Sequence, residues 1–238
     1  MRRLLRITGT LLIVAGLGGL AWAAVVWQWQ DPFTAAVHHY EQRELEQRFE
    51  RRLEDDPARV VVAPASASPQ ELRRALKREA RDWRNELERG DAVARLRIPK
   101  LGVDEIVVNG TDADTLKRGP GRYLGSGMPG EGELVYVAGH RTTYGAPFSR
   151  IDRLQKGDRV FVELPYGTFE YRISGHRIVA ATELSVLKSR GTELLALQAC
   201  HPRFFASQRY IAYAKPIGVV PAGRGSGAVP LTLGSTED

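Results

Sequence analysis

Three side chains that can cooperate in acyl transfer stand at the ends of short apolar segments. Cys200 follows one such segment, Arg209 precedes the next, and His140 ends another. An ionised thiol is a nucleophile, an imidazole can protonate a leaving amine, and a guanidinium can hold the oxyanion of a tetrahedral intermediate. Ends of strands are also places that a substrate can reach. This combination predicts acyl transfer through a thioester.

Each of these residues also has a simpler structural interpretation. A cysteine that ends an apolar strand is more often a small buried hydrophobe, a lone histidine a hydrogen-bonding group, and a lone arginine a surface charge. Cys200 is the only cysteine among 238 residues, which excludes an internal disulfide and a multi-cysteine metal site. No carboxylate cluster typical of a calcium site stands out, so we expect neither metal nor cofactor. Residue types alone leave catalysis and structure about equally favoured.

The elements that must position these side chains are short strands. Apolar and β-branched segments recur between Gly, Pro and Asp from about residue 92, which predicts a mostly β domain over 92–221, a closed barrel or a sandwich. Little helix is expected, at 113–118 and 148–154. The predicted strands are 94–98, 105–108, 134–138, 160–164, 169–173, 176–180, 194–199 and 210–214.

The N-terminal segment predicts a membrane anchor. Residues 7–30 contain no ionisable side chain, and about 20 apolar residues suffice for a helix to cross a bilayer. Three arginines precede the segment and Asp31 follows it, which puts the N-terminus in the cytoplasm and the rest of the chain outside. A cleaved signal peptide is the alternative, but its apolar region is usually shorter. We therefore expect a single-pass membrane protein, residues 1–31 forming its tip and anchor.

Residues 32–91 predict a charged helical stalk. Apolar residues recur at helical intervals over 38–56 and 70–89, with a Pro/Ala/Ser hinge at 63–69 between them. The net charge of the chain is +6, but acidic and basic residues alternate in the stalk, so we expect solvated helix faces and no nucleic-acid partner. The Gly-rich tail 222–238 is predicted to be disordered.

Several motifs together resemble a sortase, most closely the class E housekeeping sortases of actinobacteria. The resemblance spans essentially residues 92–217 with the motifs in the same order. It implies an eight-stranded sortase-type β-barrel with short helices, preceded by a transmembrane helix and the stalk. The motifs are IPKLGV at 98–103, GPGRY at 119–123, AGHRTTYGAPF at 138–148, LQACHPRF at 197–204 and Gln208–Arg209.

The resemblance also implies a reaction and its partners. A membrane-anchored cysteine transpeptidase of this family cleaves a sorting signal of LPxTG or LAxTG type, carried by a secreted protein, between Thr and Gly. It then joins the Thr carbonyl to a cell-wall amine. Carried over by position, Cys200 is the nucleophile, His140 the acid and base, and Arg209 the substrate- and oxyanion-stabilising group.

Three further residues are implied as substrate contacts: Tyr123, Ala199 and His201. The chain departs from the family at two of its positions, since the usual T-L-x-T-C run reads Ala196-Leu197-Gln198-Ala199-Cys200 here. A hydroxyl beside the nucleophile is lost, which puts the preferred motif and the rate in question.

Other functions stay open at this point. A sortase-fold scaffold that binds the wall with little turnover is one, and a pilus-type sortase with an inhibitory lid at Asp31-Pro32-Phe33 is another. Ser185-Val186-Leu187-Lys188 matches the S-x-x-K motif of penicillin-binding proteins, but neither partner motif follows it.

Overall fold

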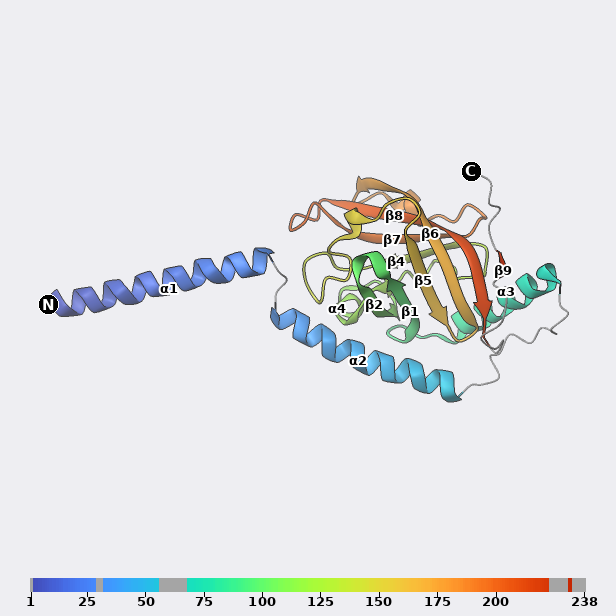
Figure 1. The fold of residues 1–238 in the computed structure, drawn as a ribbon, viewed down its shortest axis with the longest axis horizontal. Coiled ribbons are helices and arrows are strands. Elements are labelled where there is room, and N and C mark those ends of the chain that lie inside the picture. The colour runs from blue at the N-terminus through green and yellow to red at the C-terminus, as the bar shows by residue number, and fades with distance from the viewer. Residues whose placement is uncertain (1, 29–31, 56–67, 223–230, 233–238) are drawn as a thin grey trace.

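The computed structural model describes residues 2–28, 32–55, 68–222 and 231–232. Three helices come first, and strands with short helical turns follow (Figure 1). The helices are α1 (Arg2–Gln28), α2 (Pro32–Asp55) and α3 (Pro69–Glu86). The short helical elements are η2 (Pro99–Leu101), α4 (Ala113–Arg118), η3 (Ile151–Arg153) and η4 (Leu184–Leu187).

Eight of the strands close into a barrel. Their order is β6-β5-β1-β2-β3-β4-β7-β8, and β6 also pairs with β8 along its length, so that the barrel has no open edge there. A ninth strand, β9, adds two residues to the side of β8. The strands are β1 (Ala92–Ile98), β2 (Val103–Asn109), β3 (Gly121–Arg122), β4 (Leu134–Ala138), β5 (Arg159–Leu164), β6 (Gly167–Ala180), β7 (Leu194–His201), β8 (Gln208–Pro221) and β9 (Leu231–Thr232).

The expected eight-stranded barrel is confirmed, with differences in detail. The segments predicted as separate strands at 169–173 and 176–180 form one strand, β6, whose pairing with β8 shifts at an irregularity between Ile173 and Gly175. The two-residue β3 carries no periodic pattern and was not predicted. The expected helix at 113–118 is α4, whereas only 151–153 of the expected 148–154 is helical. Within the predicted disordered tail, 231–232 form β9; 223–230 and 233–238 lie outside the described residues.

The core fills the barrel with the inward side chains of each strand. Along β7, Leu195, Leu197 and Ala199 belong to the interior cluster, because successive side chains of a strand point to opposite faces. The alternate residues of β7 point outward, and Cys200 is on that outward side. Large aromatic side chains complete the interior: Phe148, Tyr166, Phe169 and Tyr171 are all fully buried.

Helix α3 packs directly on this core. It begins with a capping box, in which Ser68 and Glu71 satisfy each other's backbone N–H groups. Trp83 is 1% exposed, and its indole N–H donates a hydrogen bond to the Val93 carbonyl oxygen at 3.1 Å. Leu72 and Leu76 belong to the same cluster as the barrel strands. The apolar side of this predicted helix is therefore buried in the interior.

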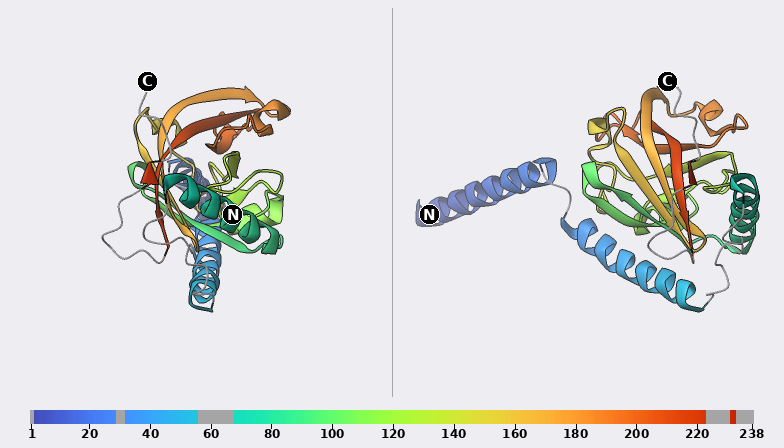
Figure 2. Two further views of the ribbon diagram at one scale, coloured as in Figure 1. Left: turned by 90° about the vertical axis from the view of Figure 1, so that its right-hand side faces the viewer. Right: turned by 45° about the vertical axis from the view of Figure 1, so that its right-hand side comes forward.

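Helix α2 lies along the outside of the barrel (Figures 1 and 2). Leu45 and Phe49 are buried against β1 and β2. The Gln42 side-chain amide donates to the carbonyls of Ile106 and Arg118 and accepts from the Ile106 N–H. Both predicted stalk helices thus exist, but their inner faces pack on the barrel and are not solvated. The boundary between stalk and catalytic domain at residue 92 stays a prediction.

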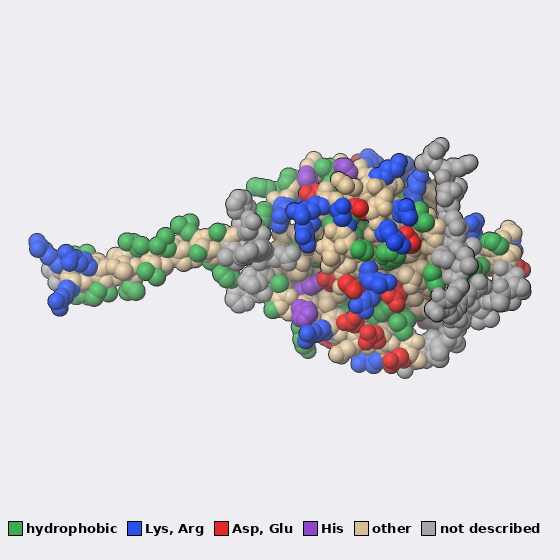
Figure 3. All heavy atoms as spheres, viewed as in Figure 1, with side chains coloured by type: hydrophobic (Ala, Val, Ile, Leu, Met, Phe, Trp, Pro, Cys, Tyr) green, Lys and Arg blue, Asp and Glu red, His purple; other side chains and the backbone are tan. Residues whose placement is uncertain are grey.

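Helix α1 is long and apolar enough to cross a membrane over Arg2–Ala24. Hydrophobic side chains lie along it and basic ones at its start (Figure 3). None of the 18-residue window that meets this criterion is buried in the protein. These properties are typical of a membrane anchor or of a signal sequence.

Candidate active site

Cys200 and Arg209 are direct neighbours on the outward face of the barrel wall. The antiparallel register of β7 and β8 pairs these two residues, which places their Cα atoms about 4.5–5.5 Å apart. Both side chains are half-buried, and the thiol is free. The Arg209 guanidinium donates hydrogen bonds to the carbonyls of Ala206 and Gln208, at 2.8 and 2.9 Å. The cation is thus held at the mouth of the hairpin that carries the thiol.

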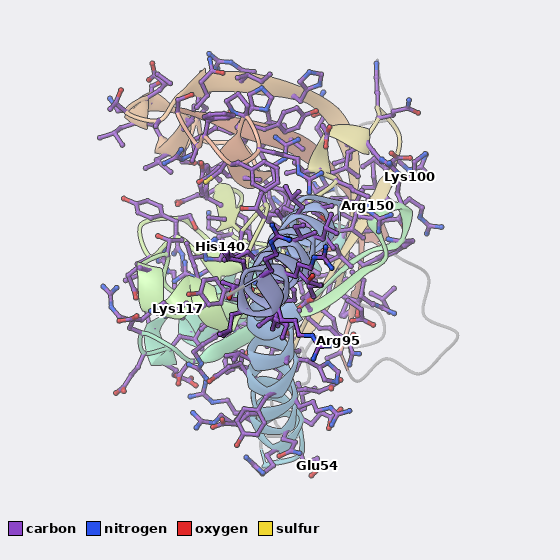
Figure 4. All side chains as sticks on the ribbon, turned by 90° about the vertical axis from the view of Figure 1, so that its left-hand side faces the viewer. Glu54, Arg95, Lys100, Lys117, His140 and Arg150 are labelled. Atoms are coloured by element: carbon purple, nitrogen blue, oxygen red, sulfur yellow. The ribbon has the colours of Figure 1, made fainter. Side chains whose placement is uncertain are left out.

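His140 is brought to the same place by parallel pairing. In the register of β4 and β7, Ala138 pairs with Gln198, and the next N–H, of Gly139, donates to the Gln198 carbonyl at 2.9 Å. His140 stands two residues beyond Ala138, as Cys200 stands two residues beyond Gln198, so both lie at the same end of these two neighbouring strands. Figure 4 views the end of the barrel at which His140 lies. The three residues singled out in the sequence therefore lie in or just beyond the ends of three adjacent strands.

The His140 imidazole favours its neutral form. Burial lowers its pKa below the ordinary value of 6.5, and the nearby His38 lowers it further. Its ring packs at 5.1 Å, centroid to centroid, on the ring of Tyr144. A neutral imidazole at neutral pH can accept a proton, which is the property of a base.

Arg141 connects the histidine loop to the nucleophile strand. Its side chain is almost fully buried, and its guanidinium donates to the Cys200 carbonyl at 3.2 Å and contacts His201 Nδ1 at 2.9 Å. It also forms an ion pair with Asp152 at 3.0 Å. Its Nε has no hydrogen-bond partner among the described residues. Arg141 is part of the motif at 138–148, but no sequence signal indicated that its side chain is buried next to Cys200.

The start of α2 holds the loop that follows His140. Tyr144 has a positive φ of 50°, and its backbone N–H donates to the Thr34 hydroxyl at 3.1 Å. The His38 ring packs on the next residue so closely that a Cβ at Gly145 would overlap it. His38 is buried and its Nε2 is hydrogen-bonded to the Glu105 carboxylate at 2.9 Å, while its Nδ1 has no partner among the described residues. Neither Thr34 nor His38 was predicted to lie here.

The face of the barrel wall that carries Cys200 continues as an apolar surface, here called the site face. It is formed by outward side chains of β4, β6, β7 and β8, and Tyr123 and residues 186–187 pack against it. Its buried members are Leu134, Tyr136, Val179, Ala196 and Ile211. These side chains are covered in this structure and lie on the same side of β7 as Cys200.

The three expected substrate contacts have different surroundings. Tyr123 is half-buried at the edge of the site face, where its ring meets that of Tyr136 edge-on at 6.4 Å. His201 is half-buried beside Cys200 and is held by Arg141. Ala199 is fully buried in the barrel interior, on the side of β7 opposite to Cys200. Its side chain therefore points to the side of β7 opposite to Cys200, and its contact with substrate stays a prediction.

Among the described residues, no group of three or more His, Cys, Asp or Glu side chains is placed to hold a metal ion. Asp31, the first residue of the possible lid, lies outside the described residues, and the side chains of Pro32 and Phe33 are not described either.

The fold and the arrangement of the site define a barrel with a free cysteine beside an arginine at one rim. The family model of the Sortase domain matches residues 96–217, just over half of the chain. The chain therefore belongs to the sortase family.

The chain is similar to relatives from two different sortase classes. Sortase D of Bacillus subtilis is 37% identical over 134 residues, which cover 55% of this chain and 66% of the relative. Sortase SrtE1 of Streptomyces coelicolor is 31% identical over 166 residues, covering 60% and 47%. The chain thus spans less than two thirds of the length of either relative. A sortase D and a sortase E both occur among these relatives, so the similarity establishes the family but does not assign the class.

Solved structures agree on the fold. A Clostridium perfringens Sortase D5 transpeptidase has a TM-score of 0.56 at 25% identity, covering 77% of this chain and 99% of that one. Sortase E1 of Streptomyces coelicolor, solved with a tripeptide in its active site, has a TM-score of 0.53 at 28% identity, covering 59% and 98%.

Proposed function

We propose that this protein is a membrane-anchored cysteine transpeptidase of class E. It cleaves a sorting signal of LPxTG or LAxTG type between Thr and Gly and joins the Thr carbonyl to a cell-wall amine. The observation that carries the proposal is the pairing of Cys200 with Arg209 across β7 and β8; His140 follows the end of the adjacent strand β4. The quoted motifs and the similarity to Sortase E1 support class E, and the similarity to Sortase D supports class D as the alternative.

The chemistry follows from the three side chains. The sulfur of Cys200 attacks the Thr carbonyl carbon, and the neutral His140 imidazole accepts the thiol proton. Arg209 stabilises the oxyanion of the tetrahedral intermediate by a charge-assisted hydrogen bond. When the C–N bond breaks, His140 gives its proton to the Gly amine, and a thioester remains on Cys200. An acceptor amine then attacks the thioester, His140 takes its proton, and the thiol is restored with a new amide bond.

The lowered pKa of His140 supports this direction of proton flow. A residue that is neutral before attack can remove the thiol proton, and once charged it is a strong acid toward the leaving amine.

The location outside the cell, and with it the partners, belongs to the same proposal. A retained α1 with arginines at its start and an apolar span of Arg2–Ala24 supports a single-pass anchor with a cytoplasmic N-terminus. The barrel would then meet secreted proteins that carry sorting signals, and the amines of the wall or its precursor, close to the membrane surface.

The test uses the full-length chain in detergent. A fluorogenic peptide that contains LAxTG or LPxTG, with an amine acceptor, should give Thr–Gly cleavage and a joined product. Cys200→Ala should abolish both reactions, because no sulfur remains to form the thioester. Unchanged turnover in Cys200→Ala contradicts the proposal, and activity lost instead in Ser185→Ala favours the penicillin-binding interpretation.

Binding assays separate the remaining alternative. A protein that cleaves no peptide from a broad panel but binds purified cell wall equally well with and without Cys200 is a scaffold. Joined subunits in place of a wall product would indicate the pilus type.

A further inference from the structure

A second concave site lies at the far end of the site face. It is a pocket of about 330 Å³ formed where β4 and β7 begin, between β6, β8 and the segment that precedes β7. Its apolar lining includes Leu134, Leu194, Val186 and Tyr213, all of which belong to or pack on the site face. The pocket therefore lies on the same side of β7 as Cys200, at the opposite end of the strand.

The strand register fixes how this pocket relates to the thiol. Leu194 and Cys200 point to the same face of β7, because even steps along a strand preserve the face. Six residues separate them, which is about 20 Å at about 3.3 Å per residue. Across the strands, Tyr213 stands opposite Ala196 as Arg209 stands opposite Cys200. An extended peptide with its carbonyl at Cys200 reaches the pocket about six residues away.

Four basic side chains line the pocket, and none of its described lining residues is acidic. Lys188, Arg190, Arg177 and Lys215 come from the segment before β7, from β6 and from β8. All four are exposed, and none has an ion pair or hydrogen bond described for its side chain. Their positive charge at the pocket is therefore open to an incoming anion.

Arg177 and Arg190 influence the pKa values of two neighbouring groups, Tyr213 and Glu183. Burial raises the pKa of Tyr213 at the floor of the pocket, and Arg177 and Arg190 act in the opposite direction. The pKa of Glu183, outside the pocket, is held below its ordinary value chiefly by hydrogen bonds from Ser185 and to a smaller extent by Arg177. Arg190, Lys188 and Lys215 have no such acidic neighbour described.

We propose that this pocket binds acidic side chains of the substrate in the segment that precedes the sorting motif. The proposal rests on the proposed function, since it takes the residue attached to Cys200 as the Thr of the motif. It also takes the N-terminal side of the peptide to run from Cys200 toward Leu194. Four motif residues then extend about 13 Å from the thiol, and the pocket receives residues about two or three positions further toward the N-terminus. Carboxylates there meet the cations, while their neighbours rest on the apolar lining.

The arrangement of the cations favours an extended acidic peptide over a phosphate group. The four charges come from three separate segments around an apolar floor. A phosphate site instead usually gathers backbone N–H groups and side chains on one point, often at a helix N-terminus. Long, mobile Lys and Arg side chains at a rim suit carboxylates whose exact positions vary along a peptide.

The experiment compares matched peptides with the full-length protein in detergent. Each contains the same sorting motif, preceded by Asp-Asp, Ser-Ser or Lys-Lys at the two positions that reach the pocket. We expect kcat/KM to be about 3- to 10-fold higher for the Asp peptide than for the Ser peptide, mainly through KM, and the preference to fall with added salt. Placing the same Asp pair after the scissile bond should give no gain.

Variants test whether the pocket causes the preference. Arg190→Gln combined with Lys215→Gln should remove the Asp preference and leave cleavage of the Ser peptide unchanged. Arg51→Gln combined with Lys156→Gln removes the same charge from exposed positions outside the pocket and should keep the preference. An equal preference in both double variants, or no preference in the wild type, overturns the proposal.

A binding measurement keeps this proposal separate from the catalytic one. Fluorescence anisotropy measures how tightly the labelled Asp and Ser peptides bind to the Cys200→Ala protein, which cannot turn them over. Tighter binding of the Asp peptide, lost in the Arg190/Lys215 variant, supports the pocket even if no peptide is cleaved. Competition by inorganic phosphate without any difference between the peptides would show a phosphate site and would overturn the peptide assignment.

Discussion

The backbone N–H of Tyr144 donates a hydrogen bond to the Thr34 hydroxyl at 3.1 Å, across 110 positions of the sequence. Thr34 lies in the first turn of α2, and Tyr144 lies in the loop that follows His140. The helix that comes after the apolar α1 is thereby fixed to the candidate active site. It braces the loop that carries the imidazole.

Removing this bond should slow catalysis. In Thr34→Val the shape is kept and the acceptor is lost, which costs about 0.5–1.5 kcal/mol for a typical hydrogen bond. We expect kcat/KM to fall by about 2- to 10-fold and the Tyr144 amide to exchange hydrogen faster. Thr34→Ser should restore both, and the exposed Thr182→Val is the control. If the Tyr144 amide of Thr34→Val exchanges hydrogen at the wild-type rate, this hydrogen bond does not hold the loop.

His38 should tune the titration of His140. Burial lowers the pKa of His140 most, and His38 lowers it further, so His38→Gln should raise this pKa toward 6.5. If His140 acts as a neutral base, the acidic limb of the kcat/KM profile then moves to higher pH. Ring NMR signals of labelled histidine give the pKa directly. The exposed neighbour His39→Gln is the matched control; equal shifts in both variants would remove the specific role of His38.

Arg141 should act on the chemical step through the position of Cys200. Lysine at this site cannot reproduce the bonds to the Cys200 carbonyl, His201 and Asp152 together. We expect Arg141→Lys to lower kcat by about 10- to 100-fold with a smaller change in KM, as the loss of about 1.5–3 kcal/mol implies. The exposed Arg153→Lys should behave as wild type. A change confined to KM would contradict a positioning role.

Helix α3 should contribute to the stability of the barrel. Trp83→Ala leaves a large cavity in the core and removes the bond to the Val93 carbonyl. The free energy of unfolding should fall by about 3–5 kcal/mol, as measured by urea titration of the full chain in mild detergent. Lys77→Ala, on the exposed side of the same helix, is expected to change it by less than about 0.5 kcal/mol. Similar midpoints for the two variants would show that α3 does not stabilise the barrel.

Restoring the family residue at position 199 should not improve this protein. Ala199 is fully buried among apolar side chains, so Ala199→Thr adds volume and a hydroxyl to a packed interior. We expect the free energy of unfolding to fall by about 1–3 kcal/mol and kcat/KM not to rise. Ala196→Thr, on the site face, is the informative comparison. A more active and equally stable Ala199→Thr would show that the interior has room for the hydroxyl.

Local patterns in the sequence predicted most of the strands and helices and the three residues proposed for catalysis. Alternating apolar residues identified the strands, a 24-residue segment without ionisable side chains identified the apolar helix, and Cys200, His140 and Arg209 stood at strand ends. These are local signals, because strand periodicity and helix length are properties of neighbouring residues. The family motifs likewise lie within short stretches of the chain.

Contacts between residues far apart in the sequence become visible only in the folded protein. The contact of Thr34 with Tyr144, the burial of Arg141 behind Cys200 and the orientation of Ala199 into the core all depend on strand register and on the docking of α2. The gathering of Leu194 and four basic side chains around one pocket also depends on strand register. No local pattern encodes these contacts, because each joins segments that are far apart in sequence and is selected by packing of the whole barrel.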